Sequence, residues 1–209
     1  MEPKEARLRT PRAAGMAGAV FAVLLATAIV LVRISVPTGN PPGARIDPDK
    51  RWAVQAALEI LPFAGIFFLW FMGAVRAHVA EGEDRFVATV FLGSGLIFVA
   101  TMFGAGAAAG TVLDDVRSDF GRYFAYTMMT TYALRVAAVF VFTTSTIGHR
   151  LGVLPRPLAY LGYLVGLVLL VTASSVPWTE LVFPAWALVV SLHILRVGLR
   201  EPRGPRNPR

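Results

Sequence analysis

The chain has 209 residues, of which 56% are hydrophobic and 16% are charged, and its mean hydropathy is +0.61. Soluble domains are about 25% charged, so this composition excludes an ordinary water-soluble domain. The absence of cysteine excludes disulfides and thiolate metal sites, and the net charge of +7 does not predict nucleic-acid binding, because the arginines lie mostly at the ends of apolar runs.

Six apolar runs follow one another along the chain, each close to the length that crosses roughly 30 Å of hydrocarbon. A basic head at 1–12 precedes them, and a basic, proline-rich tail at 199–209 is predicted to be disordered. The predicted fold class is all-α, a polytopic transmembrane helical bundle of about six spans in one domain at 13–198. The spans are predicted at 13–32, 52–75, 86–109, 123–148, 157–175 and 181–197.

The first run resembles a secretory signal in its charged start, but it is longer than the 7 to 15 apolar residues of a signal. We therefore interpret it as a permanent span. The connection at 34–51 contains four prolines and two glycines and is predicted to be a loop.

The basic residues indicate the orientation of the spans. Thirteen lie on the side that holds both ends of the chain, six lie on the opposite side, and Arg135 lies within a span. The positive-inside rule then places both termini in the cytoplasm of a multi-pass protein. The 18 arginines, with abundant alanine, glycine and valine, are typical of GC-rich bacterial sequences, so the bacterial plasma membrane is the predicted location.

Small residues at four-residue spacing predict where helices pack closely, because close backbone approach holds helices together in lipid. Three such stripes occur: Gly18, Ala22 and Ala26; Ala100, Gly104 and Ala108; and Gly162 with Gly166. Homodimerisation through one of them is the alternative interpretation.

Arg135 is the most informative charged residue, because an arginine at the bilayer centre costs at least about 2.5 kcal/mol. Glu59 is the only acidic residue well inside a predicted span and is the expected partner. His193 is predicted at a similar depth. Gln55, Thr127 and Thr131 complete the predicted polar cluster, which is either a structural ion pair or a pocket for a substrate, a lipid headgroup or a proton.

The candidate catalytic and cofactor motifs in the sequence are incomplete. Ser94 and His193 suggest a Ser/His dyad, but Leu92 stands where a rhomboid-type motif requires glycine. The acidic cluster Asp114, Asp115 and Asp119 resembles half of a magnesium-diphosphate site, and a solvated loop explains it better. The histidines do not predict haem binding, and no nucleotide motif is present, so no cofactor is predicted.

The segment Thr143 to Leu167, with the LVFPAW stretch from Leu181 to Trp186, resembles part of a family of uncharacterised six-span bacterial integral membrane proteins. This resemblance implies topology and no activity. Two functions are predicted: a non-enzymatic accessory, regulatory or assembly role, or a small transporter or lipid-handling protein with a polar pocket at Arg135, Glu59 and His193. A membrane enzyme acting through His149 and Arg150 is a third class. The predicted partners are the bilayer and its anionic headgroups, and a homo-oligomer or a membrane-protein partner is left open.

Overall fold

The structure is a computed structural model that describes residues 10–35, 48–77, 85–111, 113, 119–172, 176 and 178–200. Within these ranges the chain forms helices and turns and contains no strand, which confirms the all-α bundle. The helices are α1 (Thr10–Ser35), α2 (Arg51–Ala77), α3 (Arg85–Gly110), α4 (Asp119–Thr127), α5 (Leu134–Arg150), α6 (Arg156–Val171) and α7 (Val182–Arg200). A π-helical segment, η2 (Met128–Ala133), joins α4 to α5, and the 3-10 turns η1 (Pro48–Lys50) and η3 (Thr179–Leu181) precede α2 and α7.

Five segments are long and apolar enough to cross a membrane, at 12–35, 48–76, 85–110, 120–150 and 179–197. The sixth apolar helix, α6, is shorter, with 16 residues. It ends four residues before the predicted end of its span, because Thr172 adopts an extended conformation (φ −65°, ψ 127°). These helices indicate a membrane-embedded protein. Most of the predicted head and tail, at 1–9 and 201–209, lies outside the described residues.

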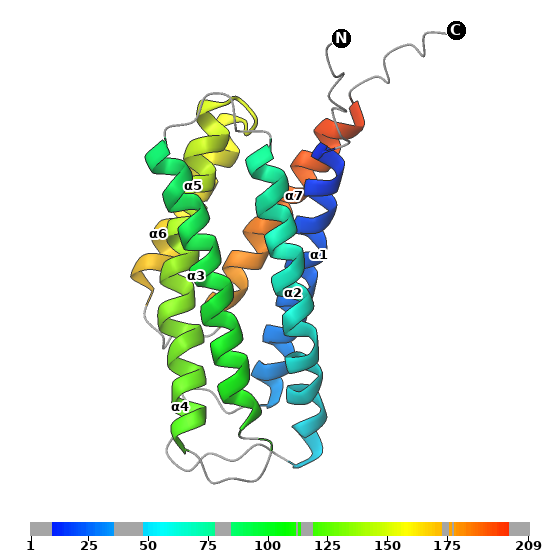
Figure 1. Cartoon of the computed structure of the whole chain (residues 1–209), viewed down its shortest axis with the longest axis vertical. Helices are drawn as coiled ribbons and strands as arrows, with labels where there is room; N and C mark the ends of the chain where they lie inside the picture. The colour runs from blue at the N-terminus through cyan, green and yellow to red at the C-terminus, as the bar shows by residue number, and fades with distance from the viewer. Residues whose placement is uncertain are drawn as a thin grey trace, which may run out of the picture.

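The helices run up and down along the long axis of the bundle, and most of them end near one of its two ends, whereas α6 ends and α7 begins about half-way along the bundle (Figure 1). We call the end where α1 begins and α7 finishes the terminal end, and the opposite end the far end. α1 packs mainly on α2 and α7, whereas α5 packs mainly on α6 and α3. Contact between α2 and α3 joins these two groups of helices. At the far end, the Arg51 guanidinium donates to the Leu113 carbonyl and links the start of α2 to the end of α3.

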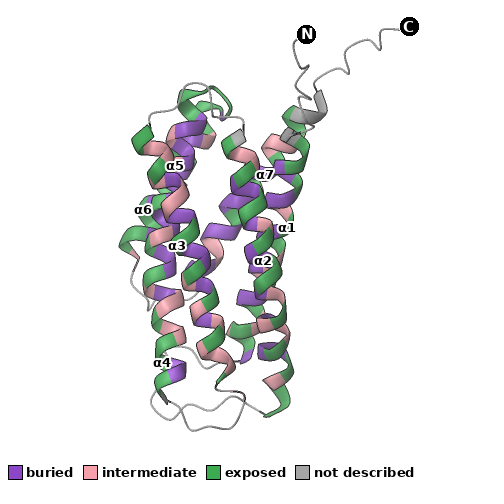
Figure 2. Cartoon of the chain, viewed as in Figure 1, coloured by how far each residue is buried: buried purple, intermediate pink, exposed green. Residues whose placement is uncertain are grey.

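A cluster of phenylalanines forms the centre of the bundle. The ring of Phe68 lies 4.7 Å from that of Phe21, 5.2 Å from Phe98, 4.9 Å from Phe140 and 6.1 Å from Phe183, measured between centroids. These side chains come from five different helices and are buried. Figure 2 shows that the buried residues of the helices lie mostly on the faces that turn towards other helices. The tilted and edge-on ring pairs are the arrangements that aromatic quadrupoles favour, and they hold the two groups of helices together.

Two of the three predicted small-residue stripes lie at helix contacts. A Cβ added to Gly162 would collide with the Ser145 hydroxyl, and one added to Gly18 would collide with the Ser191 hydroxyl. The stripe in α3 points elsewhere, because Ala100 is exposed and nothing lies within 4 Å of a Cβ added to Gly104. α3 is apolar around its whole circumference, so the spacing of small residues alone did not identify its packed face.

Candidate functional site

A partly open cavity of about 160 Å³ lies at the far end of the bundle, between α1 and α4. Its lining is mostly apolar and comes from α1, α2, α3, α4, η2 and η3. A closed apolar cavity of about 150 Å³ holds a benzene-sized molecule, so this space fits a section of a hydrocarbon chain. The apolar lining residues include Leu25, Ile29, Val54, Leu58, Leu61 and Met129.

Small side chains create this space. Ala57 on α2, Ala105 and Ala109 on α3 and Ala28 on α1 face it where larger residues would fill it. α4 packs on α3 and η2 and has no extensive contact with α1, so the gap between α4 and α1 remains open. Phe21 lies one helical turn from Leu25, on the side of the terminal end. The phenylalanine cluster therefore borders the cavity on that side.

A π-helical segment forms part of the cavity wall. Met129 and Thr130 of η2 both line the cavity, and the Thr130 hydroxyl donates to the Tyr126 carbonyl at 2.8 Å. π-helical insertions in α-helices are rare and are frequent at functional sites. The segment therefore marks this wall of the cavity independently of the charged residues described next.

Three charged side chains belong to the lining. The Arg33 guanidinium, in the last turn of α1, forms an ion pair with the Glu180 carboxylate in η3. Arg122 of α4 lines the same cavity, and its guanidinium carbon lies 4.8 Å from the centroid of the Tyr123 ring. The site thus combines two cations and one anion with a hydrocarbon-lined space.

These charges are largely withdrawn from the surface. Glu180 is 7% exposed and Arg122 is 8% exposed, and the side chain of Arg33 is 13% exposed. Removing charged groups from water is costly unless they are paired. The ion pair explains one oxygen of Glu180, but the other oxygen, Oε2, is buried and accepts no hydrogen bond from the described residues.

The turn before η3 sets the position of Glu180. Trp178 has a left-handed backbone (φ 68°, ψ 4°), which is unusual for a bulky residue, and its carbonyl accepts the Leu181 N–H at 3.0 Å. The Thr179 hydroxyl donates to the Val176 carbonyl at 3.0 Å. Glu180 also lies next to the start of α7, where the positive end of the helix dipole stabilises a carboxylate.

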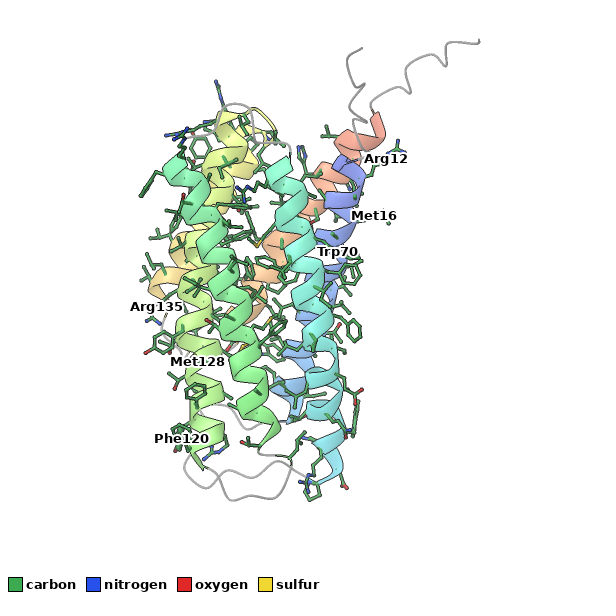
Figure 3. The ribbon with its side chains drawn as sticks, in the orientation of Figure 1. Arg12, Met16, Trp70, Phe120, Met128 and Arg135 are labelled. Carbon is green, nitrogen blue, oxygen red and sulfur yellow. The ribbon has the colours of Figure 1, made fainter. Side chains whose placement is uncertain are left out.

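The structure does not bring together the cluster predicted around Arg135. Arg135 is exposed at the edge of the bundle, and its guanidinium donates to the Thr131 carbonyl at 2.9 Å (Figure 3). Glu59 is exposed on α2, and α3 packs between α2 and α5. The two charges therefore point out of the bundle from different sides, and no ion pair between them is formed.

The remaining predicted residues are dispersed. Gln55 and Thr127 are exposed, and His193 is half-buried on α7, which packs on α1 and α6. The Ser94 hydroxyl donates to the Phe91 carbonyl at 3.1 Å within its own helix. Asp114, Asp115 and the Asp119 side chain lie outside the described residues.

The sequence analysis did not predict that Arg33, Arg122 and Glu180 line a cavity, because it used the two arginines only to assign the orientation of the spans. A signal was present: both arginines lie within a turn of a predicted span, on the side that carries fewer basic residues. Glu180 is also the only charged residue in the short connection between the fifth and sixth spans.

Comparison of the chain with protein-family models, with curated proteins and with solved structures found no match. The resemblance of Thr143 to Leu167 to six-span bacterial membrane proteins therefore stays a prediction.

Proposed function

We propose that this protein is a non-enzymatic membrane protein that binds a lipid-like amphiphile in the cavity between α1 and α4. Of the two functions predicted from the sequence, lipid handling is the one that the site supports, through Arg33, Arg122 and Glu180 instead of Arg135, Glu59 and His193. The observation that carries the proposal is that one partly open cavity is lined both by apolar side chains and by buried charged side chains.

The level of the charges in the bilayer supports this proposal. Arg12 and Arg33 are 21 residues apart on one helix, which corresponds to about 32 Å of rise. This distance matches the roughly 30 Å of hydrocarbon in a bilayer. With Arg12 at one headgroup layer, the ion pair of Arg33 and Glu180 lies at the other, and the apolar lining from Leu25 to Val32 lies at acyl-chain depth.

We also propose that the terminal end faces the cytoplasm of a bacterial cell, because 13 basic residues lie on that side against six on the other. The cavity then opens in the outer half of the plasma membrane. A lipid of that leaflet would place its headgroup at the charges and one chain in the cavity.

Native mass spectrometry of the detergent-purified protein tests the proposal. Ala109 lines the cavity on α3, whereas Ala107 on the same helix is exposed, so the two positions make a matched pair. Wild type and Ala107→Leu are expected to retain one phospholipid, and Ala109→Leu at least about ten-fold less, because leucine occupies the cavity. Equal retention by all three proteins would contradict the proposal.

A further inference from the structure

Two charged side chains lie on the outside of the bundle within apolar segments. Glu59 on α2 and Arg135 on α5 are both exposed. Within the described part of the chain, the Glu59 carboxylate has no hydrogen bond or ion pair, and the Arg135 guanidinium donates only to the Thr131 carbonyl. Glu59 lies eight residues after Arg51, about 12 Å along α2, and its short side chain does not reach the headgroups from there. A charge that faces hydrocarbon is costly, so Glu59 needs a cation from outside its own chain.

The Arg135 guanidinium lies at about the same depth as Glu59. The helices α2 and α5 run in the same direction, and the rings of Phe68 on α2 and Phe140 on α5 lie 4.9 Å apart, measured between centroids. Nine residues before each ring, towards the far end, the chain reaches Glu59 on α2 and Thr131 in η2. The Arg135 guanidinium donates to the Thr131 carbonyl at 2.9 Å and therefore lies at the level of Thr131.

A second pair of polar residues repeats this match one turn nearer the far end. Gln55 lies four residues before Glu59 and is exposed. Thr127 lies four residues before Thr131 and is also exposed. An amide and a hydroxyl at one depth can form a hydrogen bond between helices in a bilayer. We call Gln55 with Glu59 the acidic surface, and Thr127 with Arg135 the basic surface.

The two surfaces complement each other but cannot meet within one chain. Arg135 lies at one edge of the bundle, and α3 packs between α5 and α2 (Figure 3). We propose that the acidic surface of one copy binds the basic surface of a second copy, with Glu59 of one chain paired to Arg135 of the next. Copies that enter a membrane in one orientation are related by rotation about the membrane normal, which keeps the depth of every residue. Such a pair therefore needs both charges at one depth, as these helices place them.

The proposed contact joins two different surfaces. Each copy then binds one neighbour through α2 and another through α5, an arrangement that builds closed rings or open rows. Because the ion pair lies between chains, the free energy of unfolding of dissociated chains does not depend on it. None of the four residues lines the cavity, so this inference and the lipid-binding proposal stand or fall separately.

Cross-linking in vesicles tests the inference, because the chain contains no cysteine and introduced thiols are unique. Gln55→Cys and Thr127→Cys are made as two proteins with different tags, mixed at a low ratio of protein to lipid, and treated with a membrane-permeant thiol cross-linker. We expect cross-linked pairs that carry both tags and no pairs that carry one tag twice, since each surface binds only the other. Absence of mixed pairs, or equal yields of mixed and single-tag pairs, would overturn the proposal.

Charge variants in the same assay test the ion pair itself. Arg135→Met in the Thr127→Cys protein should lower the mixed yield at least about five-fold, because Glu59 loses its cation. Arg150→Met is the matched control, since Arg150 is exposed on the same helix at the terminal end, and should leave the yield unchanged. Glu59→Arg in the Gln55→Cys protein, mixed with Arg135→Glu in the Thr127→Cys protein, should restore it.

Equal yields with Arg135→Met and Arg150→Met, or no recovery when both reversed charges are present in inserted proteins, would contradict the ion pair. The mixed cross-link with unchanged charges decides the question even if a charge variant does not insert.

Discussion

The guanidinium of Arg33 pairs with the carboxylate of Glu180, 147 residues further along the chain. The contact ties the last turn of α1 to the turn that begins α7. Both side chains line the cavity, so the ion pair forms part of the cavity wall. The contact between α1 and η3 and the shape of the cavity therefore depend on the same pair.

Removal of either partner of this pair should destabilise the protein, because the remaining charge stays buried without compensation. Arg33→Met and Glu180→Met are each expected to lower the free energy of unfolding by about 3 kcal/mol, and the double variant by clearly less than the sum. Titration with a denaturing detergent measures these values. If the double variant loses the sum of the two single losses in the free energy of unfolding, the two side chains do not interact.

Substitution of Arg135 should cost little. Arg135 lies 15 residues before Arg150, about 22 Å from the terminal end, so we expect its long side chain to reach the headgroups on the side of the far end. Arg135→Met is expected to leave the free energy of unfolding unchanged within about 0.5 kcal/mol, or to raise it. Glu59→Gln should behave in the same way, and a loss above 2 kcal/mol in Arg135→Met, recovered by Glu59→Gln, would restore the predicted ion pair.

Two glycines that the sequence treats alike should respond differently to alanine. A methyl group at Gly162 collides with the Ser145 hydroxyl between α6 and α5, so Gly162→Ala is expected to cost about 1 to 3 kcal/mol. Gly104→Ala meets open space and should be neutral or stabilising by up to about 1 kcal/mol through helix propensity. Thermal unfolding of the two variants in one detergent measures both, and equal shifts would argue against the packing described for α6.

The phenylalanine cluster should contribute through packing. Phe68 is 0% exposed and contacts four other phenylalanine rings, whereas Phe63 on the same helix is 59% exposed. Phe68→Ala is expected to cost about 3 kcal/mol, because the lost contacts leave a void that the surrounding helices fill poorly. Phe63→Ala should cost less than about 1 kcal/mol, since lipid replaces the ring. Detergent unfolding compares them, and similar losses would contradict the central position of Phe68.

The architecture was predictable from the sequence because hydrocarbon thickness fixes the length of apolar runs, and 13–32 and 86–109 both fall inside helices of the structure. Rotation of each helix was not predictable. In a water-soluble protein, the apolar face of a helix is the one that packs in the core. In a bilayer, apolar residues face both lipid and protein, so the sequence of α3 did not indicate that Ala100 and Gly104 point away from the neighbouring helices.

The candidate site could not be predicted either, because its prediction also requires the rotation of each helix. Depth counted along a helix placed Arg135 and Glu59 near each other in the bilayer, but depth says nothing about which way a side chain points. Conversely, Glu180 follows a turn in which Trp178 has a left-handed backbone, and no pattern in the sequence predicts that this turn brings Glu180 to Arg33.

Photolabelling in bilayers tests most directly whether the cavity holds a lipid chain. A phospholipid with a diazirine on its acyl chain is incorporated into vesicles with the protein, illuminated, and its adducts are mapped by peptide sequencing. The account predicts adducts at cavity residues such as Met129 and Leu61, and their loss in Ala109→Leu but not in Ala107→Leu. Adducts confined to outward-facing residues such as Trp70, with none lost in Ala109→Leu, would contradict it.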